Sequence, residues 1–162
     1  MHITFGPRGI LQIDDAKLIF RNFSGEANKF NREGDRNFAI IIEDRETADA
    51  LANEGWNVKI KPPRDTDEEP FMYMSVKVKF NGRGPHIHLT TNDVTNKLDE
   101  DSICCLDHIY IAKADMDIAP FDWDVNGKTG RAAYLRSMHV VQEVEDRFAE
   151  RFNQNDSDDY PF

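Results

Sequence analysis

Short runs in which apolar and polar residues alternate constrain the fold of this chain more than any other feature. The clearest run covers residues 71–80, where every second side chain is apolar: Met72, Met74, Val76, Val78 and Phe80. A period of two places these side chains on one face of a β-strand. The other face of the run mixes aromatic rings with lysines, namely Phe71, Tyr73, Ser75, Lys77 and Lys79. The run therefore predicts a strand with one buried face and one face of unusual chemistry.

Similar runs recur along the chain between Gly, Asn, Pro and Asp residues. They predict further strands at 16–23, 36–43, 56–61, 86–91, 108–118 and 131–142, the last two joined as a long hairpin with its turn near 126–130. Short helices are expected at 45–54, capped by Asp44 and ended by Gly55, then at 99–106 and at 144–152. Alternation assigns Phe20, Phe38 and Trp56 to the core.

Several strands, a few short helices and a long late hairpin are typical of a small β-barrel. We predict a mainly β OB-fold, a five-stranded Greek-key barrel, over residues 1–152, followed by a disordered tail over residues 153–162. An antiparallel sandwich is the alternative. The chain has no run of eighteen apolar residues, and residues 1–4 lack the features of a signal peptide, so a cytoplasmic location is expected. Adjacent Cys104 and Cys105 are poorly placed to bridge each other, and we expect reduced thiols.

The net charge of −10 at first argues against a polyanionic partner. The acids, however, are concentrated outside three segments. Residues 55–64, 70–92 and 125–142 contain no Asp or Glu, and each carries a charge of +3. This segregation permits a basic face on an acidic protein. The alternative for any one segment is a solvated strand face lined with lysines.

A protein that binds single-stranded nucleic acid needs cations for the phosphates and exposed rings for the bases. The sequence offers both in three clusters. The first contains Arg21, Phe23, Lys29, Phe30, Arg32 and Arg36, and in an OB-fold its loop would line the binding cleft. The second contains Lys59, Lys61, Tyr73, Lys77 and Lys79. The third, on the expected hairpin, contains Phe121, Trp123, Lys128, Arg131, Tyr134 and Arg136. For each ring, packing in the core is the alternative.

The chain ends on a polar, acidic segment with a terminal aromatic residue. Its acids and Pro161 disfavour packing and helix formation, so a disordered tail is expected. The ring and terminal carboxylate of Phe162 could enter an apolar pocket with a cation at its mouth. The residues expected to bind a partner protein are Asp156, Asp158, Asp159, Tyr160, Pro161 and Phe162. An acidic tail with a chance aromatic residue is the alternative.

This ending resembles that of bacterial single-stranded DNA-binding proteins, which finish on an aspartate run followed by Pro-Phe, although they usually carry an aliphatic residue where Tyr160 stands. Residues 30–38, 55–59 and 121–128 are similar to a family of tailed-phage single-stranded DNA-binding proteins with OB-folds. The resemblance covers most of the chain. It implies sequence-independent binding of single strands in phage replication or recombination, with no catalytic residues, no cofactor, and replication proteins as partners of the tail.

Two other functions remain open at this point. The pairs Asp115/Asp117 and Asp122/Asp124 have the spacing of carboxylates that could hold Mg²⁺ in a nuclease or recombination accessory enzyme, although an alternating acidic edge is commoner. A protein-interaction adaptor that never touches nucleic acid is the other. A zinc site is conceivable among His86, His88, Cys104, Cys105 and His108, but the usual zinc spacings are missing. A homodimer is also left open.

Overall fold

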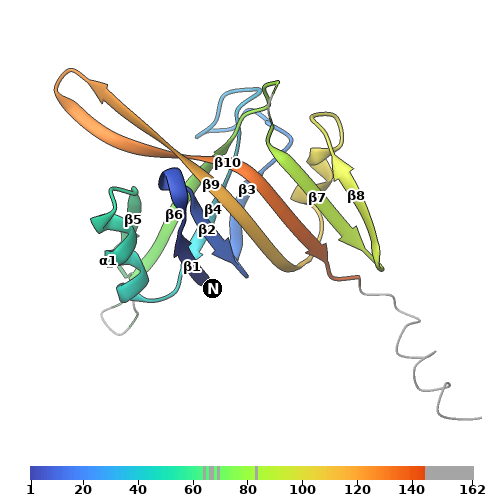
Figure 1. Cartoon of the computed structure of the whole chain (residues 1–162), viewed down its shortest axis with the longest axis horizontal. Coiled ribbons are helices and arrows are strands. Elements are labelled where there is room, and N and C mark those ends of the chain that lie inside the picture. The colour runs from blue at the N-terminus through green and yellow to red at the C-terminus, as the bar shows by residue number, and fades with distance from the viewer. Residues whose placement is uncertain (64, 66–67, 69, 83, 145–162) are drawn as a thin grey trace, which may run out of the picture.

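The computed structural model describes residues 1–63, 65, 68, 70–82 and 84–144, and within them the chain is mainly β (Figure 1). The described strands are β1 (His2–Phe5), β2 (Leu11–Asp14), β3 (Leu18–Asn22), β4 (Arg36–Ile42), β5 (Val58–Lys61), β6 (Phe71–Val78), β7 (His86–Thr91), β8 (Val94–Leu98), β9 (Ile111–Val125) and β10 (Lys128–Gln142). The helical segments are α1 (Arg45–Asn53) and two 3₁₀ turns, η1 (Pro7–Gly9) and η2 (Ile103–Asp107).

All ten strands belong to one sheet, whose main path runs β1-β2-β9-β10-β6-β4-β3. Strand β5 pairs with β6, while β7 pairs with β10 and β8. Among the described residues no pairing joins the two ends of this path. The mainly β fold is therefore established, whereas closure into a five-stranded barrel stays a prediction.

The alternation that predicted a strand at 71–80 has its expected effect in β6. Met72, Met74, Val76 and Val78 are all buried, in a core that also contains Phe38 and Trp56, as predicted. Helix α1 begins where the sequence indicated, because the Asp44 carboxylate accepts a hydrogen bond from the Thr47 amide at 2.6 Å. Strands β1, β2 and β8 were not predicted.

The long hairpin extends further than predicted. Strands β9 and β10 each have 15 residues, and only Asn126 and Gly127 separate them. Both residues have a positive φ, as a two-residue hairpin turn requires. In Figure 1 the tip of this hairpin projects well beyond the rest of the sheet. It forms an arm.

Strand β3 corrects two predictions about aromatic residues. Its pairing with β4 shifts register between Ile19 and Asn22, and Phe20 adopts a φ of 51° within that irregularity. The alternation assumed in the sequence is broken there. Phe20, predicted to lie in the core, is 59% exposed, whereas Phe23, predicted to bind DNA, is fully buried and stacks on Phe38 with ring centroids 5.2 Å apart.

The predicted helix at 144–152 lies, apart from Val144, outside the described residues, and so does the tail at 153–162 with its partner-binding residues. The expected boundary between domain and tail lies there too. In the part of the chain that the structure describes, no helix is long and apolar enough to cross a membrane.

Candidate nucleic-acid interface

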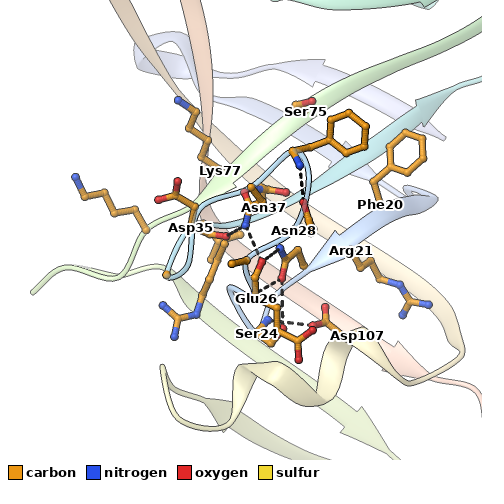
Figure 2. A pocket seen from close by; sticks show the side chains of 18 of the residues that line it. Phe20, Arg21, Ser24, Glu26, Asn28, Asp35, Asn37, Ser75, Lys77 and Asp107 are labelled. Atoms are coloured by element: carbon orange, nitrogen blue, oxygen red, sulfur yellow. Dashed lines mark hydrogen bonds between the residues drawn. The ribbon is translucent and has the colours of Figure 1, made fainter.

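A groove of about 1200 Å³ lies over the outward face of β5 and β6, between β3, the loop at 23–35 and the middle of β10. Figure 2 shows this groove, with Phe20, Ser75 and Lys77 on the strand side and Asn28 and Asp35 on the loop side. The first two clusters predicted from the sequence meet here, although they are far apart in the chain. The groove is also where the unusual face of β6 is exposed.

Three aromatic rings are packed together at one end of the outward face. The ring centroid of Tyr73 lies 5.6 Å from those of both Phe20 and Phe71, and Phe20 and Phe71 are 6.4 Å apart. The Lys61 ammonium lies 5.6 Å from the rings of Phe20 and Tyr73, and Lys59 lies 5.8 Å from Tyr73. Phe20 and Phe71 remain exposed. Exposed rings beside cations provide what a stacked base and its phosphate need.

Neither Phe20 nor Phe71 was among the residues predicted from the sequence to bind DNA. The signal for Phe71 was present, because it shares the outward face of β6 with Tyr73 and the lysines. The position of Phe20 had no such signal, since it depends on the irregular pairing of β3 with β4.

The lysines and arginines around the groove are bonded differently. Lys59, Lys61, Lys77 and Lys79 line the groove, and none forms an ion pair with a described carboxylate. Arg21, in contrast, donates to the carbonyls of Leu106 and Ile109, each at 2.8 Å. Arg36 donates to the Phe23 carbonyl at 3.0 Å and to Glu100 at 3.3 Å. The lysine ammonium groups are thus available to phosphates, while these two arginines hold the loop and η2 against the sheet.

Part of the third cluster continues the same surface onto the arm. Tyr134 lines the groove, with Lys77 5.8 Å from its ring, and its ring centroid lies 5.8 Å from that of Phe121. Phe121 and Trp123 follow along one face of β9 and are 57% and 40% exposed. Gly130 makes room for Trp123, because a Cβ at this position would lie 2.4 Å from the indole. An exposed aromatic face therefore leads from the groove towards the tip of the arm.

Arg131 has a different position from the one that the sequence suggested. Its Nε and Nη2 donate to Asp122 at 2.7 and 3.2 Å, its Nη1 donates to the Glu54 carbonyl at 2.7 Å, and its guanidinium lies 5.3 Å from the Trp56 ring. The hydrogen bond from Arg131 lowers the pKa of the Asp122 carboxyl. Arg131 thus anchors the arm to the end of α1, and each of its three nitrogens already donates a hydrogen bond.

Of the remaining predicted side chains, Phe30 lines the groove, whereas the others lie outside it. Phe30 is 91% exposed on the loop at 23–35, with the Lys29 ammonium 5.9 Å from its ring, and Arg32 is exposed on the same loop. Lys128 and Arg136 are exposed on β10, Lys128 next to the tip of the arm. Neither lines the groove.

Asp115 and Asp117 line the same smaller pocket as His86 and His88, whereas the other acidic and metal-ligand candidates lie elsewhere. Asp122 pairs with Arg131, and Asp115 lies 3.6 Å from Lys113. His86 and His88 lie with His139 in a smaller pocket, whereas His108 lines the main groove. Cys104 and Cys105 are free thiols, and burial raises the pKa of Cys105. No set of three or more His, Cys, Asp or Glu side chains is placed to hold a metal ion in the described part of the chain.

The fold and the groove define a class: a β-sheet protein whose outward face combines exposed rings with lysines that have no described carboxylate partner, as binders of single-stranded nucleic acid do. The chain belongs to the family described as "Putative phage ssDNA-binding domain", whose model matches residues 4–159. It is a phage single-stranded DNA-binding protein, as the resemblance implied, and that family is defined by binding and not by catalysis.

Solved structures of one phage protein have a similar fold. The single-stranded DNA-binding protein from bacteriophage Enc34 matches with a TM-score of 0.57 and 11% identity, covering 97% of this chain and 94% of that one. The same protein in complex with ssDNA matches with a TM-score of 0.56 and 11% identity, covering 88% and 92%. A C-terminal truncation of it matches with a TM-score of 0.55 and 10% identity, covering 86% and 88%. No curated protein sequence matches the chain.

Proposed function

We propose that this protein coats single-stranded DNA without sequence preference during phage replication or recombination, using the groove and the aromatic face of the arm. The observation that carries the proposal is the set of four groove lysines that have no described carboxylate partner. Two of them, Lys59 and Lys61, lie beside the rings of Phe20 and Tyr73. Lysines attract any phosphate and rings stack on any base, so neither group selects a sequence. The Enc34 protein in complex with ssDNA, which has a similar fold, supports the assignment.

The roles of the side chains follow from their positions. Lys59, Lys61, Lys77 and Lys79 neutralise phosphates along β5 and β6. The bases stack on Phe20, Tyr73 and Tyr134, and a longer strand continues over Phe121 and Trp123. Each stacked base contributes about 1–3 kcal/mol. A few rings are therefore enough to hold a strand on a protein whose net charge is −10.

Tryptophan fluorescence tests this proposal directly, because the two indoles differ in exposure. Trp56 is 3% exposed and Trp123 is 40% exposed on the arm. Oligo-dT should quench the fluorescence of the full chain at low salt, the apparent affinity should fall steeply with added salt, and EDTA should have no effect. Trp123→Phe should remove most of the quenching signal. Double-stranded DNA should bind the wild-type protein more weakly than oligo-dT does. The absence of binding to oligo-dT at low salt, measured with a labelled strand, would refute the proposed function.

We propose two further features. The tail recruits replication or recombination proteins through Asp156, Asp158, Asp159, Tyr160, Pro161 and Phe162, as expected from its charge and terminal ring. The sheet is an OB-fold, and the support for this is its set of short strands with one long late hairpin. Binding of the body and recruitment by the tail are separable functions, since every described residue that lines the groove precedes position 145.

A further inference from the structure

The loop at 23–35 is held together from inside by one amide side chain. The Asn31 Nδ2 lies within hydrogen-bonding distance of three carbonyl oxygens, those of Asp35 at 2.6 Å, Arg32 at 3.2 Å and Glu26 at 3.3 Å. Its Oδ1 accepts a hydrogen bond from Asn37 Nδ2 at 2.8 Å, which ties the loop to β4. A single side chain thus joins both halves of the loop to the sheet.

Other polar contacts complete this network. Asn28 and Asn31 exchange backbone hydrogen bonds at 2.9 and 3.3 Å, and the Asn28 Oδ1 accepts from the Phe30 amide at 2.8 Å. At the base of the loop the Asp107 carboxylate accepts from the amides of Phe23 and Ser24 at 2.7 and 3.0 Å. Figure 2 shows Asn28, Asn37 and Glu26 gathered inside the loop, with Asp107 beside Ser24.

Phe30, at the centre of this ordered segment, has a ring that is not packed in the core. Phe30 is 91% exposed, the most exposed large apolar side chain described, and it lines the groove. An exposed ring on a mobile loop would lose backbone entropy on stacking. Here the backbone on both sides of Phe30 is already held by hydrogen bonds.

We propose that Asn31 is a positioning residue for single-strand binding: its amide orders the loop so that Phe30 is presented to a base at little entropic cost. Asn31 itself need not contact DNA, because its polar atoms are already bonded within the protein. Its contribution to affinity is exerted through the ring of Phe30. The inference rests on the proposed function, which supplies the stacked base.

A double-mutant cycle tests the coupling in the full chain. Binding of a labelled oligo-dT is measured for wild type, Asn31→Ala, Phe30→Ala and the double variant. Asn96→Ala on β8 is the matched control, since Asn96 is exposed and does not line the groove. Asn31→Ala should weaken binding about fivefold or more, the equivalent of re-ordering about one residue. In the Phe30→Ala background the same change should alter affinity less than about twofold. Asn96→Ala should bind like wild type.

A structural readout separates positioning from direct contact. Asn31→Ala should speed amide hydrogen exchange across residues 24–35 while leaving that of β6 unchanged. If Asn31→Ala does not fold, Asn37→Ala, which removes only the bond to Oδ1, should give a smaller loss that also vanishes in the Phe30→Ala background.

Several results would overturn the inference. One is an Asn31→Ala protein that binds oligo-dT with wild-type affinity. Another is a loss of affinity from Asn31→Ala that is equal with and without the Phe30 ring. The third is an Asn31→Ala protein whose amide hydrogen exchange in the loop is unchanged. Failure of the wild-type protein to bind oligo-dT would instead refute the proposed function itself. The two failures are therefore distinguishable.

Discussion

At the groove, lysine and arginine side chains have separate tasks. Arg21 and Arg36 donate to main-chain carbonyls, and the planar guanidinium suits such fixed bonds. Lys77 and Lys79 have no described carboxylate partner and keep long, flexible stems. This division leaves the mobile cations for an irregular partner such as a DNA backbone, and it uses the rigid cations to build the surface.

Replacing Lys77 and Lys79 together by alanine should weaken binding and reduce its salt dependence. For a single strand, each phosphate contact contributes about −0.7 to the slope of log K against log salt. Two lost contacts should therefore make this negative slope shallower by about 1.4. Oligo-dT titrations at several salt concentrations measure this change. Removing Lys17 and Lys97 alters the net charge equally, but neither lines the groove, so the slope should stay unchanged. An unaltered slope in the Lys77/Lys79 variant would place the phosphates elsewhere.

Phe20 and Phe23 are three residues apart but should respond in opposite ways to truncation. Phe23→Ala empties a fully buried site and should lower the free energy of unfolding by about 3–5 kcal/mol. Phe20→Ala removes an exposed ring, so unfolding should change little while oligo-dT affinity falls by the value of one stacked base, about 1–3 kcal/mol. Urea unfolding and DNA titration of both variants check this. A Phe20→Ala protein with wild-type affinity would show that Phe20 does not stack on a base.

At the scale of the elements, the two faces of the β9–β10 hairpin have different surroundings. One face contacts the body, where Arg131 joins Asp122, the Glu54 carbonyl and Trp56. The other face presents Phe121 and Trp123, which continue the aromatic surface from Tyr134. Alternation along a strand makes this possible, because successive side chains point to opposite sides. The arm is thus anchored by one face and free to bind with the other.

Gly130→Ala tests whether the arm takes part in binding. The added methyl group would lie 2.4 Å from the Trp123 indole, so the indole must move. We expect a changed tryptophan emission spectrum and weaker binding of oligonucleotides long enough to reach the arm. Short oligonucleotides that fill only the groove should bind as before. Gly82→Ala is the matched control, because a Cβ there meets no atom within 4 Å. An equal loss for short and long strands would mean that the arm does not extend the binding surface.

At the scale of the whole molecule, charge segregation reconciles a net charge of −10 with a polyanionic ligand. The lysines of residues 55–64 and 70–92 meet on β5 and β6, on the same side of the sheet. Carboxylates that line the groove, such as Glu26 and Asp107, belong to the loop and η2 on its other side. A strand that follows the lysines therefore runs along one side of the groove.

The acidic tail should compete with DNA for that basic side, since three aspartates and a terminal carboxylate are similar to a short run of phosphates. Deleting residues 154–162 should tighten oligo-dT binding at low salt, with the difference shrinking as salt screens the charges. The same deletion should abolish recruitment of partner proteins. Substituting Phe162 alone should impair recruitment while leaving DNA affinity nearly unchanged. Equal affinity of the full and shortened chains at low salt would argue against competition.

The sequence by itself determined the class of the fold and the chemistry of the ligand. Period-two alternation is a local property, so the strand at 71–78 and its mixed aromatic and lysine face were readable without a structure. The start of α1 at Asp44 was readable for the same reason. Two of the three acid-free segments, 55–64 and 70–92, supply the lysines of the groove, whereas the cations of 125–142 do not line it. The resemblance to phage single-stranded DNA-binding proteins added the family, which the matching of residues 4–159 confirmed.

Only the tertiary structure decided which of the candidate side chains are free to bind. An irregular pairing with β4 exchanges the expected positions of Phe20 and Phe23. The carbonyl partners of Arg21 lie 85 and 88 residues away, and that of Arg131 lies 77 residues away. Exposure and bonding of a side chain depend on contacts between distant segments, which no local pattern encodes. The sequence therefore named the kinds of residue expected in the interface, and the fold decided which of them line the groove.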